Sequence, residues 1–246
     1  AVTMRTPGDD FDLVAGFDGL RSTTRQHLAA SAFLPRPSGY AAWRVQVPRH
    51  PDVKRMEFLQ GVGSKTGAMP LSDNLMYLFH IRPEEPGAVF AREDYVRLFQ
   101  ERLAQYGSYV TNIRESLNDA SDIVYSPIEP MMLPWPWYRG RVAIGGDAAH
   151  VVPPHLTQGA AMAAEDGYIL ALEALAQDVP LEARLMRYSQ KRYARCTFVY
   201  SFSRQWLDEE QSVRTEEELT VACKEFAANA SVRIGASDRV LNTRIF

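Results

Sequence analysis

The sequence predicts an α/β fold with mixed α+β character, on three observations. Two short apolar strands each end in an acidic turn, at Asp18-Gly19 and at Gly146-Asp147, and a helix is expected after each turn. Alternating apolar and polar residues between about 39 and 132 are typical of a mostly antiparallel sheet. The remaining C-terminal residues have the spacing of amphipathic helices.

Changes in sequence texture divide the chain into four segments. They are a strand with a short helix, a sheet domain, a second strand–turn–helix unit and a pair of C-terminal helices, at 1–38, 39–132, 133–180 and 181–246. Within the sheet domain we expect strands at 40–47, 58–69, 74–81 and 123–132 and a helix at 92–105. The C-terminal helices are expected at 181–208 and 215–229. Their basic and acidic residues predict solvated faces, at Arg184, Arg187, Lys191, Arg192 and Arg195 and at 208–210 and 216–218.

The composition excludes several classes of protein. The 246 residues carry a formal net charge of −3, whereas a general nucleic-acid binder needs a basic surface, so we expect no nucleic acid. No stretch approaches the roughly 18 apolar residues of a membrane helix, so we expect no membrane. Cys196 and Cys223 are too few for a disulfide framework or a four-ligand zinc site. These features favour a cytoplasmic protein, with thiols that are buried or half-buried.

The stretch from Gly145 to Asp166 carries the strongest chemical pattern. An Asp at the end of a strand in an α/β sheet lies where ligands bind, so Asp147 can accept hydrogen bonds from sugar hydroxyls. A helix that starts at Gly159 has free backbone N–H groups and a partial positive charge, which suit an anion. His150 is expected to be a buried histidine with satisfied hydrogen bonds. His155 lies five residues further on without a third ligand, so we expect no metal site.

Two motifs in order resemble those of the single-component FAD-dependent aromatic hydroxylases, the para-hydroxybenzoate hydroxylase-like flavoprotein monooxygenases. The family's first motif, like G-A-D-G-x-x-S-x-x-R, stands here as Gly16-Phe17-Asp18-Gly19-Leu20-Arg21-Ser22-Thr23-Thr24-Arg25. The second, like G-D-A-A-H-x-x-x-P-x-x-x-Q-G, stands as Gly146-Asp147-Ala148-Ala149-His150 with Pro154, Gln158 and Gly159. The resemblance implies part of an FAD-binding Rossmann-like domain and a sheet that covers the substrate. Phe17 departs from the small residue usual at its position, and Gly167 stands where Ala is common.

The resemblance also implies which residues contact FAD. Gly146 and Asp147 would hold the ribityl or ribose hydroxyls. The backbone N–H groups of Gly159, Ala160 and Ala161 would face the flavin N1–C2=O edge, which becomes negative when the flavin is reduced.

Four further residues are implied at the same cofactor. Pro154 would shape the loop beside the isoalloxazine ring. Asp18, Gly19 and Arg25 would support the FAD and nicotinamide side of the groove.

The reaction implied is hydroxylation of an electron-rich aromatic or N-heteroaromatic small molecule. NADH or NADPH would reduce FAD, O2 would add at C4a, and the hydroperoxide would transfer oxygen to the substrate. Residues proposed to line the substrate pocket are Arg44, Met69, Phe79 and Met131. A His or Tyr could take the substrate's proton, which makes Tyr77, His80 and His155 the catalytic candidates, with core packing as the alternative for each. Alternation places Tyr77 and Phe79 on one face of their strand and His80 on the other, so only one set can face the ring.

No G-x-G-x-x-G occurs in the sequence, although the family's ADP-binding unit needs one. We therefore expect the chain to be a C-terminal portion whose partner is an N-terminal FAD-binding segment or chain, the complete protein being a monomer or homodimer. Two alternatives stay open at this point. One is a flavin-dependent epoxidase or polyketide-tailoring monooxygenase, and the other is a non-catalytic module that binds no FAD.

Overall fold

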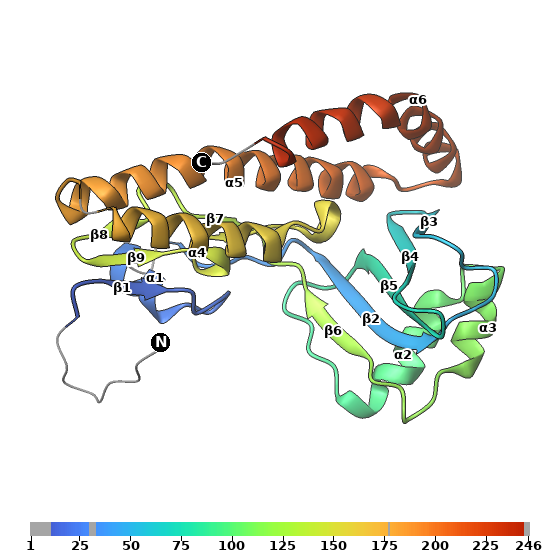
Figure 1. Cartoon of the computed structure of the whole chain (residues 1–246). Helices are drawn as coiled ribbons and strands as arrows, with labels where there is room; N and C mark the ends of the chain where they lie inside the picture. Colours follow the sequence, from blue (N-terminus) through green and yellow to red (C-terminus); the bar gives the residue numbers. More distant parts are fainter. Residues whose placement is uncertain (1–10, 30–32, 177, 244–246) are drawn as a thin grey trace. The chain divides into compact units, whose positions relative to one another are not determined.

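A computed structural model describes residues 11–29, 33–176 and 178–243 of the chain. These residues form two compact units (Figure 1). The first unit takes residues 1–36, 130–204 and 239–246, and the second takes 37–129 and 205–238. Within the described residues, each helix is too short or too polar to cross a membrane. The first ten residues of the predicted 1–38 segment lie outside the described part of the chain.

A small sheet brings the two acidic turns of the first unit together. Strand β1 (Val14–Gly16) pairs in parallel with β9 (Val142–Ile144), and β8 (Tyr138–Arg139) pairs with β9 in the antiparallel sense. Helix α1 (Thr23–Ala29) follows the first turn, and a 3-10 turn, η3 (Gly146–Ala148), follows the second. The ends of β1 and β9 therefore lie side by side, although they are far apart in the sequence.

Two long helices pack beside each other in the first unit. After η3, strand β10 (His150–Val151) pairs with β7 (Met131–Met132), and the 3-10 turn η4 (Pro154–Leu156) leads into α4 (Gly159–Leu175). Helix α5 (Leu181–Ser212) runs along α4 (Figure 1). Fully buried side chains from these elements fill the core, including Trp137, Ile144, Met162, Leu185, Tyr188 and Val199.

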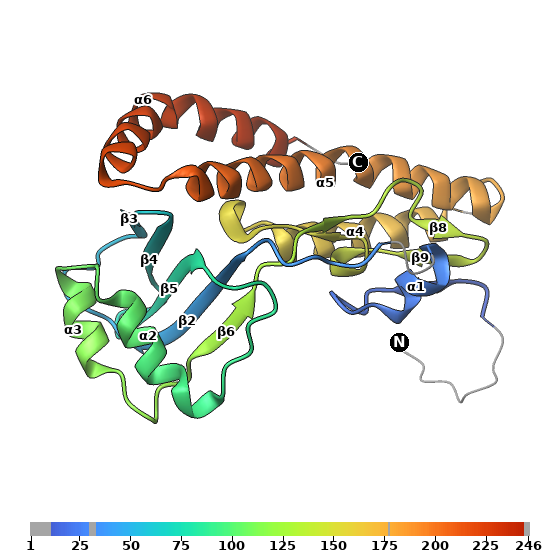
Figure 2. The same cartoon turned by 180° about the vertical axis from the view of Figure 1, so that it is seen from behind.

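The second unit contains an antiparallel five-stranded sheet in the order β3-β4-β5-β2-β6. The strands are β2 (Tyr40–Pro48), β3 (Glu57–Gly61), β4 (Ser64–Pro70), β5 (Leu75–Pro83) and β6 (Val124–Pro127). A 3-10 turn, η2 (Arg92–Asp94), precedes α2 (Tyr95–Leu103), and α3 (Tyr109–Ser116) follows (Figure 2). Both helices pack on one face of the sheet, over a core that includes Trp43, Val45, Met76, Leu78, Phe99, Leu103, Val110 and Ile113.

Two predicted strands are wrong in extent. The stretch 58–69 is a hairpin of β3 and β4, because Gly63 turns the chain with a φ of +59° that L side chains rarely adopt. The stretch 123–132 is divided between β6 and β7, which belong to different sheets. Pro127 and Pro130 lie at the break, where a proline cannot donate a hydrogen bond to a strand ladder.

The C-terminal helices are longer than the spacing predicts. Helix α5 runs to Ser212, and α6 (Glu216–Leu241) runs well past 229. The Ala-rich stretch after Phe226 continues the helix, since alanine has the highest helix propensity.

Candidate functional site

Asp18 organises the first acidic turn as a helix cap. One carboxylate oxygen accepts hydrogen bonds from the backbone N–H groups of Thr23 and Thr24 at 2.9 and 3.0 Å, and the other accepts one from the Ser22 hydroxyl at 2.6 Å. Partial burial raises the pKa of Asp18, but these bonds outweigh it and hold the pKa well below its ordinary value. Gly19 adopts a φ of +78° in the same turn. The carboxylate therefore fixes the start of α1.

Arg25 joins the two motifs within the first unit. Its side chain is 1% exposed. One guanidinium nitrogen donates to the backbone carbonyl of Ala148 at 3.1 Å, and the other donates to that of Leu20 at 2.7 Å. Burial lowers the pKa of Arg25, and the nearby carboxylate of Asp18 opposes that shift. The predicted cofactor roles of Asp18, Gly19 and Arg25 stay predictions, since these contacts show them supporting the turns.

The first motif tolerates the large Phe17 side chain because the neighbouring residue at position 145 is a glycine. An ideal Cβ at Gly145 would lie 2.5 Å from the Phe17 ring, and one at Gly16 would lie 2.5 Å from the Thr24 side chain. Both positions therefore require glycine, because a neighbouring side chain approaches the backbone too closely for a Cβ atom. The ring occupies space that a side chain at position 145 would fill.

Asp147 differs from the other acidic residues of the unit. Its side chain is exposed, and within the described residues its carboxylate has no hydrogen-bond or ion-pair partner. The protein around it raises its pKa by limiting hydration, and His150 opposes that shift. Gly146 precedes it with a φ of +57°, and a Cβ there would lie 3.1 Å from the Ala163 methyl group. The backbone therefore presents an unused carboxylate next to α4.

The start of α4 presents backbone donors. Pro154 and His155 form η4, and Thr157 adopts left-handed backbone before Gln158 leads into the helix. No side chain among the described residues caps the helix, and Met162 is the first amide with an intrahelical partner, the Gln158 carbonyl. The N–H groups of Gly159, Ala160 and Ala161 thus remain available, with the two alanines exposed.

A buried network holds the second motif in place. The Asp166 carboxylate accepts from the Gly146 amide at 2.8 Å, lies 2.6 Å from His150 Nε2 and accepts from Arg192 Nε at 2.6 Å. Burial raises the pKa of Asp166, but the bonds to His150 and Arg192 bring it below its ordinary value. His150 is buried as predicted and its Nε2 is hydrogen-bonded, but the prediction that its hydrogen bonds are satisfied is wrong for Nδ1, which has no partner within the described residues.

The predicted solvated face of α5 is wrong at two positions. Arg192 is fully buried, and the Arg195 side chain is 9% exposed where it pairs with Glu165 at 2.8 Å. Arg192 also donates to Glu165 at 2.7 Å. Because Arg192 stands four residues from both Tyr188 and Cys196, it shares their buried stripe. That spacing is the signal that sequence reasoning missed.

His150, Asp166 and Cys196 bring possible metal-ligating atoms within 4.8 Å of one another. The Arg192 guanidinium already neutralises Asp166, and burial raises the pKa of the Cys196 thiol far above its ordinary value. A thiol that stays protonated is a poor metal ligand. The cluster is therefore suited to fixing η3. The other thiol differs from expectation, because Cys223 is exposed.

Four of the predicted substrate-side residues share one face of the second unit's sheet. Residue pairing aligns Arg44 with Phe79 and Met69 with Tyr77. This face is opposite the one covered by α2 and α3, because Met76 and Leu78 alternate with Tyr77 and Phe79. The Phe79 ring lies 5.8 Å from the Tyr77 ring and 5.9 Å from Phe58, which sequence reasoning missed. We call Arg44, Phe58, Met69, Tyr77 and Phe79 the aromatic face.

Gly67 and Arg44 shape the aromatic face. A Cβ at Gly67 would lie 2.2 Å from the Phe79 ring, so only glycine leaves room for that ring at this position. Burial raises the pKa of Tyr77, while the positive charge and hydrogen bond of Arg44 oppose the shift. The face therefore combines aromatic rings with a guanidinium.

His80 lies on the opposite face, among the residues that α2 and α3 cover. It is fully buried, its Nδ1 is 2.9 Å from the Thr66 hydroxyl, and its ring meets Tyr106 edge to face. Burial, with a contribution from Arg82, lowers its pKa to about 3. Its predicted catalytic role stays a prediction, but this surrounding is that of a neutral core histidine.

The two remaining candidates belong to the first unit. Met131 is buried in β7, and His155 is half-buried in η4 beside Pro154. The predicted roles, a substrate contact for Met131 and catalysis for His155, stay predictions.

The donor set of the first unit fits FAD. The exposed Asp147 carboxylate can accept from ribityl or ribose hydroxyls, and the N–H groups from Gly159 to Ala161 can donate to the N1–C2=O edge. The buried network around Asp166 keeps the backbone beside Asp147 rigid before any ligand binds.

Comparison with known proteins places the chain in a family. Residues 10–203 match the family model described as an FAD binding domain. The 2-heptyl-3-hydroxy-4(1H)-quinolone synthase of Pseudomonas aeruginosa is 35% identical over 197 residues, which are 77% of this chain and 50% of the relative. The aurachin C monooxygenase/isomerase of Stigmatella aurantiaca is 31% identical over 75% of this chain and 48% of its own length. The chain thus spans about half the length of the curated relatives it matches.

The fold agrees with solved flavoprotein structures. Klebsiella pneumoniae HpxO in complex with FAD and uric acid superposes with a TM-score of 0.83 at 23% identity, over 96% of this chain and 61% of that chain. A salicylate hydroxylase substrate complex superposes with a TM-score of 0.66 at 19% identity, over 93% of this chain and 64% of that chain. These matches confirm the predicted mixed α/β fold. Together with the family match, they confirm the resemblance drawn from the two motifs: the chain belongs to the FAD binding domain family of FAD-dependent monooxygenases.

Proposed function

We propose that the chain is the substrate-bearing portion of an FAD-dependent monooxygenase that hydroxylates an electron-rich aromatic or N-heteroaromatic small molecule, using NADH or NADPH and O2. The observation that carries the proposal is the unpaired Asp147 carboxylate close in sequence and structure to the free amides that begin α4. Relatives whose names specify a quinolone, urate and 3-amino-4-hydroxybenzoate support this substrate class.

The cofactor-side residues bind and orient. Asp147 accepts hydrogen bonds from FAD hydroxyls, and Pro154 shapes the loop before α4. The amides of Gly159, Ala160 and Ala161 stabilise negative charge at the N1–C2=O edge, because the helix terminus carries a partial positive charge. When bound and reduced, FAD supplies the activation of O2 that oxygen transfer requires.

The aromatic face binds the substrate. Tyr77 and Phe79 offer ring surfaces to a planar apolar molecule, and Met69 adapts to its outline. Arg44 stabilises a deprotonated hydroxyl or a carbonyl oxygen on the substrate, which raises the electron density of the ring to be oxidised.

The partner is an N-terminal FAD-binding segment or chain. Within the described residues, β1 is an edge strand that pairs only with β9. Phe11, Val14 and Phe17 beside this edge are 54%, 44% and 40% exposed. An unpaired strand edge with apolar neighbours is a surface on which another strand can pair.

The test compares Asp147→Ala with Asp119→Ala in the complete protein. Asp119 is exposed and lies in the second unit, so its substitution controls for loss of a surface charge. Titration of flavin fluorescence should show at least a tenfold weaker Kd for FAD only in Asp147→Ala, as expected for loss of a charge-assisted hydrogen bond worth about 1.5–3 kcal/mol. Equal FAD affinity in both variants would overturn the site. Absence of flavin absorbance in the complete wild-type protein would favour the non-catalytic module.

A further inference from the structure

A cavity of about 320 Å³ lies within the second unit, apart from the aromatic face. It is bounded by the β3–β4 hairpin, the end of α5 and one side of α6. Its volume is at the low end of the range of about 300–1,000 Å³ for small-molecule sites. None of the residues named above for FAD or for the substrate lines it.

Aromatic and apolar side chains form one part of the wall. The rings of Trp206 and Phe226 meet edge to face with centroids 5.9 Å apart. Val213, Leu219 and Ala222 complete the apolar surface. Such a surface favours a ligand with a compact apolar body, and the Arg233 guanidinium, 5.9 Å from the Phe226 ring centroid, shows that the wall accepts a cation beside a ring.

Polar and charged side chains, three of them carboxylates, form the rest of the wall. Arg233 binds both oxygens of Glu209, at 2.6 and 3.1 Å. The buried Lys65 donates to Glu210 at 2.6 Å from behind the lining. Glu225 completes the set, and within the described residues its carboxylate makes no ion pair. Three carboxylates against these two cations leave the cavity with one negative charge in excess, carried by Glu225.

We propose that this cavity is a second ligand site, which takes a small aromatic or aliphatic ammonium compound. The apolar body packs against Val213, Leu219 and the two rings, and the ammonium group pairs with Glu225. Carboxylate and aromatic groups together are the combination that recognises organic ammonium ions. The proposed site makes no contact with FAD, so its test does not depend on whether the monooxygenase proposal is correct.

Cys223 supplies a readout that does not depend on activity. It is exposed and lines the cavity, whereas Cys196 is buried with a raised pKa. N-Ethylmaleimide should therefore modify Cys223 of the full chain selectively, and intact mass spectrometry reports the rate. A ligand that occupies the cavity slows this modification in a saturable way.

The probes are 2-phenylethylammonium, 2-phenylethanol and phenylacetate at equal ionic strength. The ammonium compound should protect Cys223 at the lowest concentration, and phenylacetate should protect least. Glu225→Gln should weaken protection by the ammonium compound about two- to fivefold, the range expected for one exposed ion pair. Glu217→Gln, on the same helix but outside the cavity, should leave it unchanged.

Three results would overturn the proposal. They are no saturable protection by the ammonium compound, equal protection by all three probes, and the same protection in Glu225→Gln as in the wild type. Circular dichroism of both variants verifies that the helix content is retained. Since both substituted side chains are exposed, both variants should fold.

Discussion

Arg192 and Asp166 form a buried ion pair between α5 and α4, with Nε 2.6 Å from Oδ1 and neither side chain exposed. The second oxygen of the same carboxylate accepts a hydrogen bond from the Gly146 amide. A guanidinium in the middle of α5 thereby fixes the backbone beside Asp147. The position of the exposed Asp147 therefore depends on the fully buried Arg192–Asp166 ion pair.

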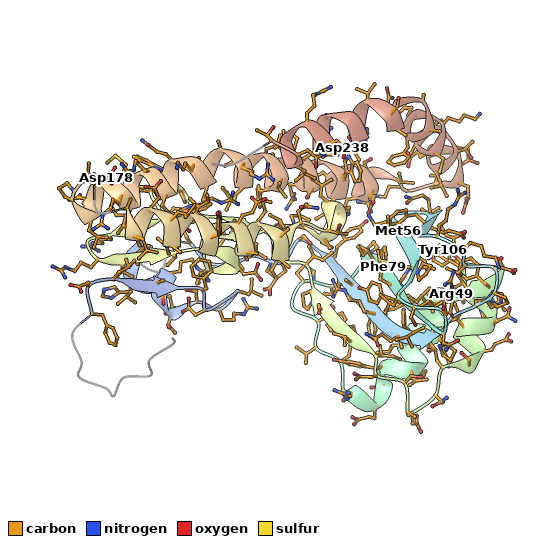
Figure 3. All side chains as sticks on the ribbon, viewed as in Figure 1. Arg49, Met56, Phe79, Tyr106, Asp178 and Asp238 are labelled. Atoms are coloured by element: carbon orange, nitrogen blue, oxygen red, sulfur yellow. The ribbon has the colours of Figure 1, made fainter. Side chains whose placement is uncertain are left out.

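Replacing Arg192 by Met should lower the free energy of unfolding by about 3–5 kcal/mol, since it leaves the Asp166 charge buried without its partner. Arg187→Met is the control on the same helix. Arg187 pairs with the exposed Asp178 (Figure 3), and its other partner, Glu173, keeps Lys191 at 2.8 Å. Urea unfolding should show less than about 1 kcal/mol for the control. If both variants lose the same free energy of unfolding, the Arg192–Asp166 pair has no special structural role.

Gly67→Ala should destabilise the protein by about 1–3 kcal/mol, because the added methyl group overlaps the Phe79 ring. In a Phe79→Leu background the same change should cost less, since the ring is gone. Gly235→Ala in α6 is the control, where a Cβ meets open space and the expected effect is a gain of about 0.5–1 kcal/mol. Thermal unfolding of Gly67→Ala, Phe79→Leu, the double variant and Gly235→Ala measures the coupling between positions 67 and 79. If the effects of the two single changes simply add, the proposed overlap between the methyl group and the ring is wrong.

His80 should make stability fall as the solution is acidified below about pH 6.5, the unfolded-state pKa of histidine. The unfolded chain then binds a proton that the folded chain, with a His80 pKa of about 3, does not. The free energy of unfolding should therefore decrease by up to about 1.4 kcal/mol per pH unit between 6.5 and 3. His80→Gln should lack this component, so urea titrations of the wild type and the variant should converge as the pH falls. Parallel pH profiles would show that the pKa of His80 is the same in the folded and the unfolded chain, which would contradict the lowered value.

Asp18→Asn should cost about 1 kcal/mol at neutral pH, because the amide lacks the negative charge of the carboxylate that accepts the hydrogen bonds at the start of α1. Because the pKa of Asp18 is lowered in the folded state, its contribution is complete above the unfolded pKa of about 3.9 and is lost as pH falls through the lower folded value. The difference between wild type and Asp18→Asn should therefore shrink in acid. Asp119→Asn, at an exposed position, should show neither effect in the same urea titrations.

Local patterns were sufficient to predict much of the fold. The apolar strand before Asp147 and the Ala-rich helix from Gly159 both lie within a residue or two of their expected positions, because each signal is local. The alternation of Tyr77, Leu78, Phe79 and His80 predicted that His80 would lie opposite the two aromatic rings. The division of 58–69 into two strands was missed, although Gly61 and Gly63 are a turn signal within that stretch.

The buried polar network could not be predicted from local patterns. A run of basic residues on a long helix usually faces water, and Arg192 differs from Arg187 only in sharing the stripe of Tyr188 and Cys196. Whether such a position holds a paired charge depends on which residue of α4 meets it. That partner, Asp166, lies 26 residues away in the sequence, so only the packed structure reveals the pair.

The bond from Arg25 to the Ala148 carbonyl joins residues 123 positions apart, and it constrains how the protein is made. At about 5–20 residues per second, β1 and α1 leave the ribosome roughly 6–25 s before the strand and turn that they pack against. During that interval strand β1 lacks its partner strand β9, whereas strands β2 to β5 of the intervening segment can already pair with one another. Strand β1 is thus a point at which a chaperone or premature aggregation would act before β9 is made, and slow codons after position 148 would not relieve it.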